Sequence, residues 1–348
     1  MAALWFALSA LMLAVYVVMD GFDFGAGGLH LAVARSDRER RQVLAAIGPY
    51  WDGNEVWLLA GGGVLFLAFP KVLAAGLSGF YLAIFLLLWV LILRGISIEF
   101  RSHVEDRMWR SFWDASFALA STLAPVLLGA ALGNLVRGVP LSADGWFALS
   151  LFESFSPTGA LGILDWYTVL AGVLALVAIL HHGALFLAWK TDGAVRQRSL
   201  RLAGYLFPAT VALWLAATVA TAALAPEVFT GLAARPLAWL ATALLLAGLA
   251  ASYVARRAGR DLAAFLGSSA FLLGVLAATA ASIYPVMLKS SGDPALSLTA
   301  ANAAAGERSL RLGLVWWPVG LALAVAYFVI LFRLHRGKAE AAAEGEGY

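Results

Sequence analysis

The sequence predicts an all-α polytopic membrane protein with about nine transmembrane helices, arranged as two four-helix bundles plus one peripheral helix. Hydrophobic residues make up 62% of its 348 residues and charged residues only 13%, whereas soluble domains carry about 25% charged residues. Apolar runs of roughly 20 residues recur along the chain, which is the length that crosses about 30 Å of hydrocarbon at about 1.5 Å per residue. These runs lack the period-two alternation of a membrane β-barrel, so we predict helices.

Nine apolar segments define the predicted spans in chain order. The first lacks the basic start of a signal peptide, so we expect it to remain as a span. A single transmembrane domain is therefore predicted over residues 1–336, and the polar residues 337–348 are predicted to form a disordered cytoplasmic tail. The spans cover roughly residues 3–33, 49–70, 76–98, 113–136, 166–189, 203–225, 236–255, 262–285 and 312–334.

The basic residues alternate between the two sides of the predicted membrane. Clusters of three or four Lys or Arg follow spans one, three, five, seven and nine, while the loops of the other side hold six in total. The positive-inside rule therefore places the N-terminus outside and the C-terminus in the cytoplasm.

Composition also excludes several classes of site. The sequence has no cysteine, which removes disulfides, thiolate metal sites, iron–sulfur clusters and a cysteine nucleophile. Its basic residues fall in short, separated clusters, so we expect no nucleic-acid partner. No metal site is predicted.

Two pairs of acids lie inside the first two predicted spans. Asp20 and Asp23 share one helix face at i, i+3, and so do Asp52 and Glu55. Ionisable residues in a span are costly and usually face a protein interior, a partner or water. Two interpretations remain open: the acids form a proton path from the cytoplasm, or they lock the bundle by pairing with Arg94 or Arg101.

Further polar residues follow in spans three and five. Glu99 and Arg101 are at the inner end of span three, where we expect them to come close to Asp52. His181 and His182 lie within span five, but no second helical histidine is placed to complete a haem site. Hydrogen bonding within the bundle is the preferred interpretation of these two histidines.

Several stretches resemble subunit II of the cytochrome bd-type quinol oxidases, a family that includes cyanide-insensitive members. The signature stretches are DGFDFGAG (20–27) and WDGNEVWLLAGGG (51–63). The similarity continues in family order through FPKVLAAGLSGFYLAIF (69–85), EFR (99–101), MWRSFWD (108–114), GNLVRGVP (133–140) and HGALFLAWKTDG (182–193).

The resemblance implies a place in a respiratory complex. Such a complex oxidises membrane quinol and reduces dioxygen to water without pumping protons. Haem b and haem d, or haem b alone in some members, are expected in subunit I, on which subunit II packs. A bound quinone, lipids and a small single-span subunit are further possible partners.

The resemblance also implies roles for individual residues. Asp20 and Asp52 correspond to acids of the cytoplasmic proton path, and Glu99 and Arg101 are expected near the point where protons enter. Asp23, Asn54 and Trp57 are expected to support this region, and residues that touch a cofactor are not identified.

Two other functions remain as alternatives. One is a secondary transporter with buried acids, although spans five and six lack a counterpart of the paired acids in spans one and two. The other is a purely structural subunit with no role in proton transfer.

Overall fold

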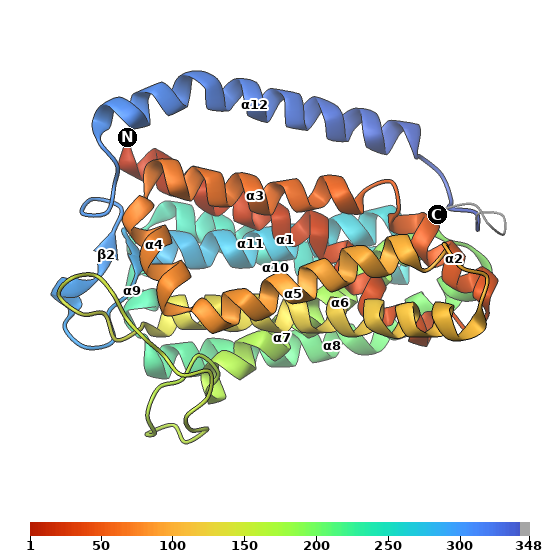
Figure 1. Ribbon diagram of the computed structural model, residues 1–348, viewed down its shortest axis with the longest axis horizontal. Coiled ribbons are helices and arrows are strands. Elements are labelled where there is room, and N and C mark those ends of the chain that lie inside the picture. Colours follow the sequence, from red (N-terminus) through yellow and green to blue (C-terminus); the bar gives the residue numbers. More distant parts are fainter. Residues whose placement is uncertain (342–348) are drawn as a thin grey trace.

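Long helices aligned along one common direction build the molecule (Figure 1). The computed structural model describes residues 1–341. Within these residues, eight helices are long and apolar enough to cross a membrane, and a ninth span exists if one bent helix pair is counted as a unit. The predicted all-α membrane fold is therefore confirmed.

The chain forms twelve helices, a short 3-10 helix and a two-stranded antiparallel sheet within the described residues. Helices α2 and α9 are short and connect longer ones; they were not predicted. In order the elements are α1 (Ala2–Val33), α2 (Asp37–Ile47), α3 (Trp51–Ala68), α4 (Pro70–Gly79), α5 (Tyr81–Phe100), α6 (Arg107–Arg137), α7 (Trp166–Lys190), α8 (Gly193–Leu224), α9 (Glu227–Ala234), α10 (Pro236–Arg257), α11 (Asp261–Ile283), β1 (Val286–Leu288), η1 (Pro294–Leu296), β2 (Leu298–Thr299) and α12 (Glu307–Leu334).

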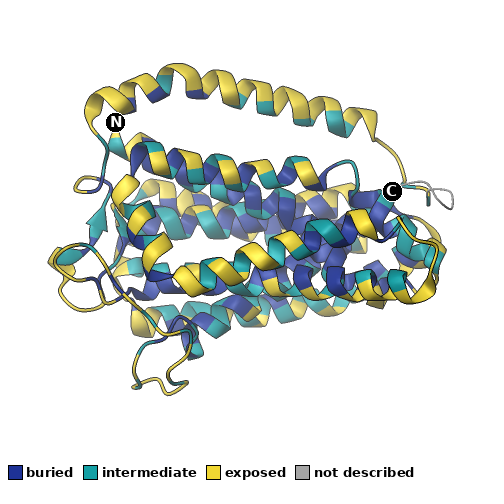
Figure 2. Cartoon of the chain, in the orientation of Figure 1, coloured by how far each residue is buried: buried dark blue, intermediate teal, exposed yellow. Residues whose placement is uncertain are grey.

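Helix α1 is the central element of the fold. It packs against α3, α6, α7 and α11, and Figure 2 shows buried residues concentrated in this middle layer. Close approach to α7 depends on two glycines, because a Cβ on Gly25 would come within 2.6 Å of the Gly183 Cα atom. Small residues of this kind let membrane helices meet backbone to backbone.

The other long helices extend this centre on two sides. Helices α3 and α6 contact α1 on one side, and α5 packs on α6. On the other side α8 and α11 pack on α7, and α10 packs on α11. Helix α12 lies apart along one flank with mostly exposed residues (Figures 1 and 2). It is held to the bundle by aromatic contacts, including Trp317 with Trp5 and Phe328 with Trp57.

The second predicted span is broken. Helix α3 ends at Ala68, Pro70 begins α4, and the two helices are bent by 120°. Proline has no N–H to continue the α3 hydrogen-bond ladder and is favoured at a first helical position. The predicted start of span three at residue 76 was therefore wrong, because residues 76–79 finish α4 and α5 begins at Tyr81.

The described chain remains attached to the bundle beyond α12. The Ala339 amide donates to the Lys190 carbonyl at 2.6 Å, and Lys338 Nζ donates to the carbonyls of Ala188 and Trp189. The ordered chain thus extends past the predicted boundary at residue 336. The tail predicted to be disordered covers residues 337–348, and its residues 342–348 lie outside the described residues.

Candidate functional site

Helix α1 carries three buried ionisable side chains. Asp20, Asp23 and His30 are each fully buried. Asp20 and His30 are ten residues apart, or about 15 Å along the helix axis. Two distinct polar clusters therefore lie along one helix.

The first cluster surrounds the guanidinium of Arg94 from α5, which is also fully buried. Its Nη2 donates to both carboxylate oxygens of Asp20, at 2.9 and 3.0 Å, and to Glu55 Oε1 at 2.6 Å. The rings of Phe24 and Trp51 lie 4.8 and 5.5 Å from the guanidinium carbon. Aromatic faces attract such a cation, so Arg94 is held by charge and by packing.

Asp23 lies beside this ion pair but has a neutral partner. Asn54 Nδ2 from α3 donates to Asp23 Oδ2 at 2.7 Å and to the Met19 carbonyl at 3.0 Å. Asp23 Oδ1 has no hydrogen-bond partner among the described residues. The first cluster, defined as Asp20, Asp23, Glu55 and Arg94, thus places three carboxyl groups around one guanidinium.

The second cluster surrounds Asp114 of α6, whose side chain is 1% exposed. His30 Nε2 donates to its Oδ1 at 2.7 Å, Arg101 Nε donates to the same oxygen at 2.6 Å, and Arg40 Nη1 donates to Oδ2 at 2.8 Å. Arg101 Nη2 also bonds Asp37 of α2 at 2.8 Å. This second cluster, defined as His30, Asp37, Arg40, Arg101 and Asp114, ties α1, α2, α5 and α6 together.

Asp52 lies in the first turn of α3, three residues before Glu55 of the first cluster. Its side chain is exposed, and it makes no hydrogen bond or ion pair within residues 1–341. Glu55, one turn further along α3, is 32% exposed and reaches Arg94. Exposure therefore decreases from Asp52 through Glu55 to Asp20.

Other predicted site residues are placed differently from expectation. Arg101 bonds Asp114 and Asp37 instead of Asp52, because the end of α5 packs on α6. Glu99 is exposed in the last turn of α5. Trp57 is buried and stacks on Phe328 of α12.

Asp114 and His30 were not among the predicted site residues. Asp114 ends the MWRSFWD stretch, just ahead of an apolar run, and an acid in that position was a usable signal. Arg94 was named only as a possible locking partner. A single arginine within the apolar LILRGIS stretch marks it as the obligatory counter-ion of a buried acid.

The two histidines of α7 differ. His181 packs on Phe207, and its Nε2 has no hydrogen-bond partner among the described residues. His182 contacts Ser268 Oγ through Nδ1 at 2.7 Å and donates to the Val18 carbonyl through Nε2 at 3.0 Å. Both ring nitrogens are therefore engaged, which confirms the predicted hydrogen bonding for His182 and does not suit an axial haem ligand. Within residues 1–341, no group of three or more His, Cys, Asp or Glu side chains could hold a metal ion.

The comparisons with known proteins agree with one another. The family model of cytochrome bd terminal oxidase subunit II matches residues 1–335. The "Probable cytochrome oxidase subunit 2" of Haemophilus influenzae is 29% identical, over 97% of this chain and 95% of that protein. The "Cytochrome bd ubiquinol oxidase subunit 2" of Bacillus subtilis is 32% identical, over 89% of this chain and 88% of that protein.

Two further matches are shorter or more distant. The "Cytochrome bd-I ubiquinol oxidase subunit 2" of Escherichia coli K12 is 38% identical over 56% of this chain and 50% of that protein. A chain of the bd oxidase structure from Geobacillus thermodenitrificans superposes with a TM-score of 0.73. It is 20% identical, and the superposition covers 96% of this chain and 98% of that one, so it supports the fold.

Proposed function

Because the chain belongs to the family of cytochrome bd terminal oxidase subunit II and is thus a subunit of a quinol oxidase complex, we propose that it supplies a proton path to a haem-bearing subunit I. The complex would oxidise membrane quinol and reduce dioxygen to water. This multi-pass protein of a bacterial inner membrane would have its N-terminus outside and its C-terminus in the cytoplasm.

The first cluster is the observation that carries the proton-path proposal. It holds three carboxyl groups and a single cation, and Asp23 Oδ1 has no partner among the described residues. An isolated ionised carboxylate in a dry interior is strongly disfavoured. A cluster with more carboxyl groups than cations can therefore hold a proton and pass it on.

The proposed path follows the decrease in exposure along α3 and α1. A proton would reach exposed Asp52, pass to Glu55, and then reach Asp20 and Asp23. Asn54 would hold the Asp23 carboxyl in place, and Trp57 would fix α3 against α12. Arg101 would hold the end of α5 against α6 through Asp114, and Glu99 is exposed in the last turn of α5.

Haem b and haem d, or haem b alone, would be held by subunit I and would carry electrons to dioxygen there. The engaged ring nitrogens of His182 agree with haem ligands in the partner chain. A structural quinone, lipids and a small single-span subunit would complete the complex.

A purely structural subunit is the second candidate, and the Arg94–Asp20 contact favours it. Both oxygens of Asp20 bind one nitrogen of a fully buried arginine. Such a contact would fasten α5 to α1 whether or not a proton moves. A test must therefore separate turnover from assembly.

The substitution Asp52→Asn provides that test, because an exposed side chain without partners is not needed for folding. The tagged chain would be purified in mild detergent with its partner, and its reduced-minus-oxidised spectrum and oxygen consumption measured. We expect a normal haem spectrum and turnover about a hundredfold slower, the lower end of the contribution of one acid–base group. The control is Asp144→Asn, an exposed loop acid.

Unchanged turnover in Asp52→Asn would remove this residue from the path. Loss of assembly in Asp52→Asn, with Asp144→Asn intact, would support the structural candidate. A haem-free chain that purifies alone from cells containing subunit I would contradict the oxidase proposal itself and favour a transporter.

A further inference from the structure

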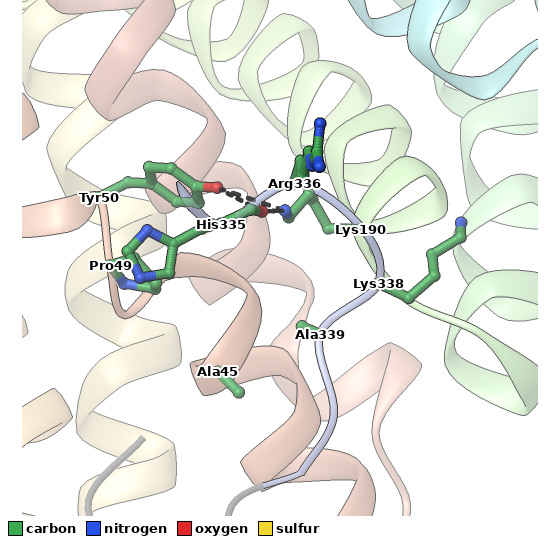
Figure 3. Close-up of a pocket in the computed structure, with 8 residues that line it drawn as sticks. All are labelled: Ala45, Pro49, Tyr50, Lys190, His335, Arg336, Lys338 and Ala339. Atoms are coloured by element: carbon green, nitrogen blue, oxygen red, sulfur yellow. Dashed lines mark hydrogen bonds between the residues drawn. The ribbon is translucent and has the colours of Figure 1, made fainter. Parts of the chain in front are cut away.

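A small cavity lies where the C-terminal ends of α7 and α12 meet the turn between α2 and α3 (Figure 3). Its volume is about 130 Å³, well above the roughly 10–15 Å³ that one water molecule needs. Neither the first nor the second polar cluster contributes a side chain to its wall. The cavity therefore needs an explanation of its own.

Among the described residues, the wall of the cavity contains basic side chains and no carboxylate. Lys190, Arg336 and Lys338 line it, together with Tyr50 and His335. Lys338 Nζ is 3.9 Å from Asp192 and 4.0 Å from Asp261, outside the wall. Neither Lys190 nor Arg336 has a carboxylate within ion-pair distance among residues 1–341.

Lys190 is the most informative of these cations, because it is only 3% exposed. Its ammonium donates to the His335 carbonyl at 2.5 Å and to the Tyr50 hydroxyl at 3.3 Å (Figure 3). Both partners are uncharged oxygens. The carbonyl end of α12 offers only a partial negative charge, and a buried cation normally has a full counter-charge. The cavity next to it is where an anion would supply that charge.

The position of the cavity indicates the source of the anion. It lies at the end of the bundle that carries the clustered arginines, where a membrane surface rich in anionic lipid would be. The last turns of α12, which lead into His335 of the cavity wall, expose the apolar side chains of Ile330 and Leu334. A lipid acyl chain would cover this apolar surface, whereas a free phosphate ion would not.

We propose that this cavity binds the phosphate group of an anionic phospholipid, with Lys190 and Arg336 as its charged contacts. Basic pockets between helix ends are known to accept such head groups in membrane proteins. The lipid would tie α12, otherwise held by few contacts, to α7 and to the turn before α3. This inference does not depend on the proton path.

The test is lipid binding by the membrane-purified protein, with its accompanying subunits, after delipidation. Native mass spectrometry would measure affinity for phosphatidylglycerol, phosphatidylcholine and inorganic phosphate. Arg336→Gln is compared with Arg333→Gln, since Arg333 is also exposed near this surface but does not line the cavity. We expect tighter binding of phosphatidylglycerol than of phosphatidylcholine. Phosphatidylglycerol affinity should fall about fivefold in Arg336→Gln, as for one lost basic contact of about 1 kcal/mol, and stay near wild type in Arg333→Gln.

Three results would overturn the proposal. Equal affinity for the two lipids would show that the site does not select an anion. Equal losses in the two arginine variants would indicate a diffuse surface potential. Binding of inorganic phosphate that depends on Arg336 as strongly as lipid binding does would assign the cavity to a soluble anion.

Discussion

The two polar clusters along α1 differ in the ratio of carboxyl groups to cations. The first cluster has Asp20, Asp23 and Glu55 around Arg94, whereas in the second Asp114 accepts hydrogen bonds from three basic side chains. Every carboxylate oxygen of Asp114 is occupied, while Asp23 keeps one free of partners among the described residues. The comparison separates a cluster suited to exchange protons from one suited to hold helices together.

The largest expected effect comes from Arg94→Gln. This change leaves Asp20 fully buried without its cation, and breaking a buried pair in this way costs about 3–5 kcal/mol. We expect low yield and a large fall in the thermal unfolding temperature in detergent. The double variant Asp20→Asn/Arg94→Gln should recover much of that loss, and no recovery would contradict the pairing.

Asp114→Asn should destabilise the protein less, by about 2–3 kcal/mol. The second cluster would lose its charge-assisted hydrogen bonds, but Arg40, whose side chain is 27% exposed, can turn to solvent. Thermal unfolding followed through haem release would measure this effect. Turnover per assembled complex should remain near wild type, and a loss of turnover at full haem content would make the second cluster part of the path.

Asn54→Leu tests how Asn54 holds the Asp23 carboxyl. It should lower the free energy of unfolding by about 1–2 kcal/mol, because Asp23 Oδ2 loses its only side-chain donor. Leucine has the same branched shape and the same number of side-chain heavy atoms as asparagine, which limits the repacking. Chemical denaturation of the purified complex would give the difference. The variant Asp23→Leu/Asn54→Leu serves as the control, and it should be more stable than Asn54→Leu alone.

The smallest effect is expected at Glu39, on the surface of α2. The hydrogen bond from Arg198, at 2.8 Å, holds the pKa of Glu39 below its ordinary value. A lowered folded pKa gives stability that is present above the unfolded pKa of about 4.3 and is lost as pH falls through the folded pKa. Glu39→Gln should therefore lower stability by less than about 1 kcal/mol at pH 7. The difference from wild type should vanish at acid pH in thermal scans.

The membrane spans could be predicted from the sequence because the length of an apolar run is a property of each segment alone. The positions of α1, α7 and α12 follow directly from their apolar runs. The bend after α3 was missed although Pro70 signals it, since hydropathy continues through the break. Helices α2 and α9 are too short to leave a hydropathy signal.

The candidate site was only partly predictable for a related reason. That Asp20 and Asp23 are buried follows from their apolar surroundings, and both are fully buried. Which cation meets which acid depends on how α5 and α6 rotate and pack. Arg101 was expected near Asp52 and instead binds Asp114, while Arg94 takes the place beside Asp20. Pairing between helices cannot be read from the spacing within one helix.

The most direct test of the proton path is the oxygen-consumption rate of Asp23→Asn, compared with Asp114→Asn at equal haem content. Asparagine keeps the shape of Asp23 and breaks no ion pair, so assembly should be unaffected. We predict turnover at least about a hundredfold slower in Asp23→Asn and near wild type in Asp114→Asn. Normal turnover in Asp23→Asn, with the haem spectrum unchanged, would contradict the assignment of proton transfer to the first cluster.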